Sequence, residues 1–259
     1  MGGSLAEAVP QAAADGSPLE GKSLFVPGET LTWDVTFAGV PGGRARLAVG
    51  AIGSEEGRRL VVIRAEAESA GVVSILGQTQ DTLSSWIDVD TGLPTRTEAI
   101  SAGSGKRLVV HAARVAGQTT AEVRVWSAKS GDEGTTKIAK LPNTRTHDPL
   151  SAILALRGWD AQPGGRATVY SLGAMRVWKS VFLVEGREEV DGPLGHRRVI
   201  RIRATATRMT PALAEDTSKP PRTFTVWLTD DKERIPVRFS AHTELGDVVA
   251  KITSYTASD

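Results

Sequence analysis

The feature that most constrains the fold of this chain is a two-residue alternation of apolar and polar side chains, which begins at Leu31. In residues 31–37 the odd positions are Leu, Trp, Val and Phe, and the even positions are Thr, Asp and Thr. Alternation of this kind places every second side chain on the same face of a strand, so that one face is buried and the other meets water. The pattern therefore predicts half-buried strands of an antiparallel sheet.

Similar segments recur to the end of the chain, separated by turns rich in Gly, Pro and Asp. Residues 107–115 and 119–126, for example, flank an Ala-Gly-Gln turn and predict a hairpin. Further strands are predicted at 30–37, 44–49, 61–68, 82–89, 166–172, 176–184, 197–207, 222–229, 236–243 and 248–255. Strands and turns that alternate in this way indicate an all-β fold: a large antiparallel barrel or a half-open curved sandwich.

One segment, residues 148–158, breaks the two-residue period. Its apolar side chains stand at 150, 153, 154 and 156, Asp148 can cap a helix, Pro149 suits the first helical position, and Gly158 stands where a helix ends. These signals predict one short helix between an N-terminal and a C-terminal group of strands. Residues 209–221, which contain three prolines, are predicted to be the longest loop of the body.

The first 26 residues differ from the rest because they are rich in Ala, Gly, Ser and Pro. We expect residues 1–26 to be a flexible tether and residues 27–257 to be a single β-rich domain. The first residues lack the basic start and the apolar stretch of a signal peptide, so the sequence predicts none. Two interpretations remain open: a cytoplasmic protein with a flexible start, and an exported protein whose signal segment, or lipidated cysteine, is missing from this sequence.

Composition excludes several classes of function. Lys and Arg number 31 against 30 Asp and Glu, and this balance argues against a dedicated nucleic-acid-binding protein. The absence of cysteine excludes disulfides, thiolate metal ligands and cysteine nucleophiles. No apolar run approaches the roughly 20 residues of a membrane-spanning helix.

Three segments together resemble a bacterial family known as the domain of unknown function 3108. They are PGETLTWDV at 27–35, DPLSAILALR at 148–157 and VWLTDDKERIPVR at 226–238, and the similarity continues through 246–252. The resemblance spans about residues 25–256. It implies an extracytoplasmic, β-rich protein of the cell envelope and supplies no catalytic residues.

Catalytic and metal-binding arrangements are weakly supported. His147, Asp148 and Ser151 contain the residue types of a hydrolase, but adjacent residues rarely face one another, and Asp148 is more simply a helix cap. Of the histidines at 111, 147, 196 and 242, only His242 has a nearby partner, Glu244, whereas catalytic zinc usually needs three ligands. We therefore expect neither an enzyme nor a bound metal or cofactor.

Acidic turns offer a weak alternative, a calcium site. Asp81, Asp88 and Asp90 form one acidic group, and residues 230–233 form another. Neither matches a twelve-residue calcium loop, so ordinary acidic turns are the simpler interpretation.

Arginines and tryptophans supply the candidate ligand-binding residues. Arg201 and Arg203 share one strand face and could bind a phosphate or lipid head group, or they could be paired with carboxylates such as Glu185 on an outer face. Trp33 and Trp227 are predicted to be core residues, whereas Trp126 and Trp178 could line a cavity for a lipid tail or glycan. Residues 71–77 could be a buried strand or a flap over such a cavity.

The sequence thus predicts a non-catalytic protein of the periplasm or the outer-membrane periphery. We expect it to bind an amphiphilic ligand or an envelope protein partner on a concave β-surface, with Trp126, Trp178, Arg201 and Arg203 as contacts. Membrane association is expected only through a lost lipid anchor, and no nucleic-acid partner is expected. The alternative is an assembly subunit with a filled core; an aromatic-lined pocket above about 300 Å³ would favour the ligand-binding interpretation.

Overall fold

The computed structural model describes residues 16–19, 22–69, 79–114, 120–129, 131–142, 145–173, 176–243 and 246–257. Apart from one helix, the regular elements in these ranges are strands, so the predicted all-β fold class is confirmed. The strands are β1 (Ser17–Pro18), β2 (Thr30–Phe37), β3 (Val40–Glu55), β4 (Arg58–Ser69), β5 (Thr79–Asp88), β6 (Pro94–Gly103), β7 (Lys106–Arg114), β8 (Thr120–Lys129), β9 (Thr135–Pro142), β10 (Thr146–His147), β11 (Arg166–Gly173), β12 (Arg176–Gly192), β13 (Gly195–Met209), β14 (Arg222–Thr229), β15 (Pro236–Thr243) and β16 (Gly246–Thr256).

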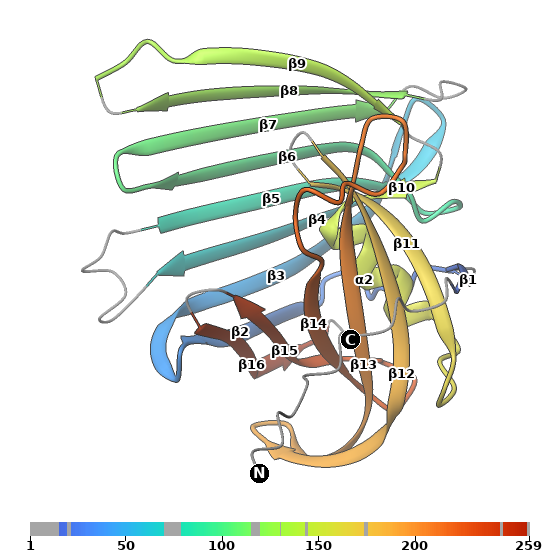
Figure 1. Cartoon of the computed structure of the whole chain (residues 1–259). Helices are drawn as coiled ribbons and strands as arrows, with labels where there is room; N and C mark the ends of the chain where they lie inside the picture. The colour runs from blue at the N-terminus through green and yellow to red at the C-terminus, as the bar shows by residue number, and fades with distance from the viewer. Residues whose placement is uncertain are drawn as a thin grey trace, which may run out of the picture.

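All these strands belong to one strongly curved sheet (Figure 1). Its order runs from β1 through β11–β16 and then β2–β9, while β10 pairs with β11 beside β1. The last strand, β16, pairs with β2, so the two groups of strands that the helix separates in sequence are continuous in space. Neighbouring strands are antiparallel except for the short β1 and β10, which run parallel to β11.

The sheet does not close by hydrogen bonds, because β9 and the strands around β11 are the two ends of the strand order. Apolar side chains meet across the two ends instead. Val123 and Leu141 from β8 and β9 share a buried cluster with Leu172, Val177 and Met209 from β11, β12 and β13. The result is a half-open barrel held together at its seam by packing of apolar surface.

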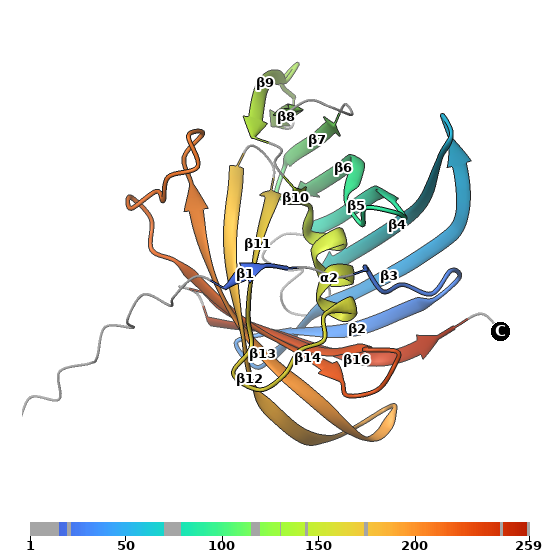
Figure 2. The same ribbon diagram turned by 90° about the vertical axis from the view of Figure 1, so that its right-hand side faces the viewer.

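The helix α2 (Pro149–Gly158) lies inside the curve of the sheet (Figure 2). It begins after the N-cap residue Asp148, has Pro149 in its first turn and ends at Gly158, as the sequence predicts. Leu150 and Leu154 pack into one core cluster, and Leu156 packs into a second that includes Ile202. The helix therefore acts as a plug that fills the interior of the barrel where these two clusters lie.

The chain before β2 passes close to the end of this helix. The amide of Leu24 donates to the carbonyl of Leu154 over 3.0 Å, and a Cβ on Gly158 would lie 1.8 Å from the carbonyl oxygen of Lys22. Only glycine allows that approach. Farther upstream, β1 pairs with β11, so described residues within the segment predicted to be a tether make packed contacts. Among the described residues, no helix has the length and apolar character needed to cross a membrane.

Candidate functional site

An open groove lies on the concave face of β3–β7, beside the N-terminus of α2. Its volume is about 430 Å³, and its lining is mostly aliphatic. We call it the inner groove and define it by the inward-facing residues Trp33, Ala45, Leu47, Ala65, Ala67, Asp81, Leu83, Thr97, Ala99, Ser101, Leu108, Val110 and Ala112, with Pro149 of α2 and Leu172 of β11.

Small side chains create this groove. Strand register places Ala45 opposite Ala67, and Ala99 between Leu83 and Val110, all on the face that the sheet curls around. Nearer the middle of α2, the same face carries larger residues such as Ile63 and Ile87, both fully buried. The concave face is thus filled beside the helix and hollow beyond its N-terminus, where alanines replace the larger side chains.

The floor of the groove is joined to the N-terminus of α2 by a buried carboxylate. Asp148 is fully buried and accepts hydrogen bonds from Ser85 on β5 at 2.5 Å and from Thr97 on β6 at 2.6 Å. Its other oxygen accepts the Ser151 amide at 2.8 Å, completing a capping box. One side chain therefore caps the helix and fixes it against two strands, and Thr97 itself lines the groove.

The sequence motif of His147, Asp148 and Ser151 has this structural role. Nδ1 of His147 lies 3.2 Å from the Ser151 hydroxyl, but Ser151 is fully buried and its hydroxyl also accepts the Asp148 amide. Burial lowers the pKa of His147 to about 4, an effect that Asp148 opposes and Arg114 reinforces. Burial likewise lowers the pKa of Arg114 to about 10. No substrate could reach Ser151 in this arrangement.

A second buried cluster holds the other end of α2. Arg157, in the last turn, donates to both carboxylate oxygens of Glu29 at 2.5 and 3.0 Å and to the carbonyl of Glu233 at 3.0 Å. Both charged side chains are almost completely buried. Burial, together with the nearby Glu29 carboxylate, raises the pKa of Tyr255. The three sequence segments that carry the family resemblance meet here, because Glu29, Arg157 and Glu233 come one from each.

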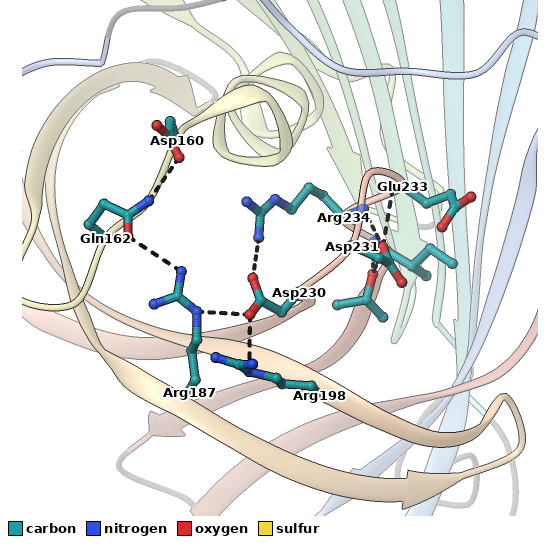
Figure 3. A network of polar contacts seen from close by, with 10 residues as sticks. Asp160, Gln162, Arg187, Arg198, Asp230, Asp231, Glu233 and Arg234 are labelled. Carbon is teal, nitrogen blue, oxygen red and sulfur yellow. Dashed lines mark hydrogen bonds and ion pairs between the residues drawn. The ribbon is translucent and has the colours of Figure 1, made fainter.

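At the turn between β14 and β15, three arginines surround Asp230 (Figure 3). Arg187, Arg198 and Arg234 approach its carboxylate at 2.8, 3.2 and 3.0 Å. Burial raises the pKa of Asp230, but the hydrogen bonds and charges of Arg187, Arg234 and Arg198 together outweigh burial, so the pKa lies below its usual value. Asp231 accepts the amides of the same turn.

These contacts explain the acidic residues considered as calcium ligands. Asp230 is already ion-paired, and Asp88 accepts the amides of Asp90 and Thr91 in a turn. Within the part of the chain that the structure describes, no group of three or more His, Cys, Asp or Glu side chains could hold a metal ion. His242 contacts Asp247 at 2.7 Å; its predicted partner Glu244 lies outside the described residues.

The four residues predicted to bind ligand lie apart from the inner groove. Trp126 points to the convex face, opposite its core neighbour Val125. Trp178 is on the opposite face of β12 from Val177 and shares that face with the core residues Phe182 and Val184. The Trp178 ring is covered by Arg222, whose guanidinium carbon lies 5.0 Å from the ring centroid. Arg201 and Arg203 are also on the convex face, both ion-paired with Glu185, at 2.8 and 2.9 Å. The structure thus brings the two arginines together and leaves the tryptophans separate.

The residues that line the groove escaped the sequence analysis. The available signal is alanine at alternate positions, Ala65 and Ala67 on one strand and Ala45 on its neighbour, where a strand core normally carries larger side chains. Residues 71–77, predicted as a buried strand or flap, lie outside the described residues.

Several solved structures are similar to this chain at low sequence identity. A β-barrel-like protein of the domain of unknown function DUF1849 from Brucella abortus has a TM-score of 0.57 and 14% identity, over 90% of this chain and 98% of its own. A protein from Bacteroides fragilis with a YmcC-like fold, inferred to be exported, has a TM-score of 0.37 and 8% identity over 90% and 99%. A protein from Parabacteroides distasonis, inferred to be a lipoprotein, has a TM-score of 0.35 and 9% identity over 94% and 100%.

The likeness to the Brucella protein shows the fold alone. No curated protein matches this chain. The sequence model of the proteins of unknown function DUF3108 matches residues 32–253, which span the whole sheet from β2 to β16 and include α2. The resemblance found in the sequence is therefore confirmed, and the chain belongs to the DUF3108 family.

Proposed function

We propose that this protein is a non-enzymatic component of the bacterial cell envelope that binds an amphiphile, with the aliphatic chain of the ligand lying in the inner groove. The observation that carries the proposal is the groove itself, a hollow of about 430 Å³ on the concave face with a mostly aliphatic lining. This volume lies within the range of about 300–1,000 Å³ that is typical of small-molecule sites. Location in the periplasm or at the outer-membrane periphery is part of the proposal and rests on the family resemblance.

The chemistry of the lining favours a flexible chain over a flat aromatic ligand or a glycan. Trp33 is the one aromatic side chain among the described lining residues, and the remaining apolar contacts are alanine, leucine, valine, isoleucine and proline. Such a surface mainly offers dispersion and desolvation of apolar area, and its inward polar side chains are Asp81, Thr97 and Ser101. A sugar would leave most of its hydroxyls without hydrogen bonds there, whereas a chain of methylene groups needs none.

The alternative, an assembly subunit with a filled core, fits the region around α2 better than it fits the groove. There α2 and the strands form two continuous apolar clusters. The groove is not filled in this way, and a purely structural barrel gains nothing from lining an open hollow with alanine. This difference favours ligand binding.

Filling the groove is expected to abolish binding. Ala99→Trp, and separately Ala67→Trp, place an indole in the inner groove, whereas Ala113→Trp places one on the exposed outer face of β7. Isothermal titration with monolauroylglycerol, a neutral single-chain amphiphile, is expected to show at least about tenfold weaker binding for the two groove variants, equivalent to about 1.4 kcal/mol.

The Ala113→Trp protein is expected to bind like wild type. Equal affinity in all four proteins, or no binding by the wild type, would contradict the proposal. Circular dichroism of each variant separates loss of binding from loss of folding.

A further inference from the structure

The inner groove does not end at the last aliphatic side chain. Ser101 and Leu108, which line its outer part, also line a second hollow of about 990 Å³ at the tips of the β6–β7 and β8–β9 hairpins. We call this second hollow the tip hollow. These tips lie at the left of Figure 1, away from α2. A long ligand in the groove would therefore extend into the tip hollow.

Side chains along the concave face change from apolar to cationic in the same direction. On β7 the inward positions are Ala112, Val110, Leu108 and finally Lys106, because alternate residues of a strand share a face. Ala112 and Lys106 are six residues apart, or about 20 Å along the strand. This is the length scale of a long acyl chain, with a positive charge at one end only.

Lys106 is directly opposite Lys129 in the antiparallel ladder of β7 and β8. Two like charges in such a pair have Cβ atoms only about 4.5–5.5 Å apart and destabilise the sheet. Among the described residues, no ion pair joins either ammonium to a carboxylate, and both side chains are exposed. Lys137 on β9 is opposite Val125 of β8 and adds a third ammonium to this face.

Acidic groups near the lysines define where the positive region ends. Asp132 and Glu133, on the tip between β8 and β9, line the tip hollow with the lysines. Asp81 lies on β5 opposite Ser101, at the other side of the groove. The tip hollow thus combines Lys106, Arg107 and Lys129 with Asp132 and Glu133. Its cationic part is the pair of lysines that face each other on β7 and β8, and an anionic ligand group would lie there.

We infer that the amphiphile bound in the inner groove carries an anionic head group, a carboxylate or phosphate, held between Lys106 and Lys129. This inference rests on the proposed function, because the lysines select the head group while the groove binds the chain. A bound anion would offset the repulsion between the two ammonium groups and accept hydrogen bonds from both.

The test compares head groups on a constant chain. Titrations use laurate, lauroyl lysophosphatidate, neutral monolauroylglycerol and inorganic phosphate with wild type, with Lys106→Gln/Lys129→Gln, and with Lys219→Gln/Lys251→Gln. The last variant removes two exposed charges that line neither hollow, so it controls for net charge. Wild type is expected to bind the anionic lipids about tenfold more tightly than monolauroylglycerol at low salt, with the difference shrinking as salt rises.

The Lys106→Gln/Lys129→Gln protein is expected to lose this preference and to keep its affinity for monolauroylglycerol, while the control keeps both. Equal binding of charged and neutral lipids by wild type would overturn the inference and leave the proposed function standing. Phosphate that binds as tightly as lysophosphatidate would overturn it as well, because the chain would then contribute nothing. Failure of every lipid to bind would overturn the proposed function itself.

Discussion

Replacing Arg157 with alanine is expected to destabilise the folded protein by about 3–5 kcal/mol. The reason is that Glu29 is fully buried and its carboxylate would lose the bidentate partner at 2.5 and 3.0 Å. The carbonyl of Glu233 would also lose its donor. Chemical denaturation followed by circular dichroism measures the change in the free energy of unfolding.

Two further proteins make this prediction specific. The double variant Glu29→Gln/Arg157→Met removes both charges and keeps most of the volume, so it is expected to recover a large part of the loss. Arg64→Ala breaks an exposed ion pair with Glu66, whose side chains are 58% and 47% exposed, and is expected to cost at most about 1 kcal/mol. A cost for Arg157→Ala no larger than that for Arg64→Ala would show that the buried pair does not hold α2.

Replacing Asp148 with alanine is expected to have an effect of similar size at the other end of α2, again about 3–5 kcal/mol. Loss of the helix cap accounts for about 1 kcal/mol, and the two hydrogen bonds from Ser85 and Thr97 to a charged acceptor account for about 1.5–3 kcal/mol each. These contributions add up to about 4–7 kcal/mol, and the expected cost is smaller than that sum because the freed hydroxyls can rotate to other acceptors. Differential scanning calorimetry and denaturant titration both report this change.

Asp34→Ala is the matched control for Asp148, since Asp34 is 58% exposed and contacts only Arg44 among the described residues. It is expected to change stability by less than about 1 kcal/mol. If the two aspartate variants were equally stable, Asp148 would be an ordinary helix cap, without the role of joining α2 to β5 and β6.

The strands that sequence patterns predicted are those with a large apolar inner face. Residues 30–37 alternate without interruption and form β2 with the same bounds. The strand β6 was not predicted, because its inner positions are Thr97, Ala99 and Ser101, which line the groove. The edge strand β9 was missed for a related reason, since Lys137 occupies an inward position beside Val125. The alternation therefore fails where the concave face departs from an ordinary core.

A bulge explains the other main difference. Strands β12 and β13 are longer than predicted, extending to Gly192 and from Gly195, because the register shifts between Val184 and Gly186. One extra residue reverses the inward and outward positions, so Arg187 beyond the bulge aligns with the inward-facing Ile200. A strand prediction that assumes an uninterrupted two-residue period therefore stops at the bulge.

The candidate site was harder to predict than the fold, because alternation assigns residues to two faces without saying which face of a curved sheet is concave. Trp126 and Trp178 are on regular strands, but Trp126 is on the convex face, and Trp178 shares the face of Phe182 without lining the groove. Helix α2 was predictable from its local signals, whereas the ion pair between Glu29 and Arg157 joins residues 128 apart and has no local signature. The positions of Lys106 and Lys129 likewise depend on the pairing of two strands.

The central claim, that an aliphatic chain lies in the inner groove, can be measured at Trp33. This side chain lines the groove, and Trp86, Trp126, Trp159, Trp178 and Trp227 are not among the groove-lining residues. A fatty acid brominated on its chain quenches the fluorescence of tryptophans that it contacts. The account predicts saturable quenching of the wild-type protein by the brominated acid, no quenching by the unbrominated acid, and loss of the quenched component in Trp33→Phe. Quenching that is absent, or that is unchanged in Trp33→Phe, would contradict it.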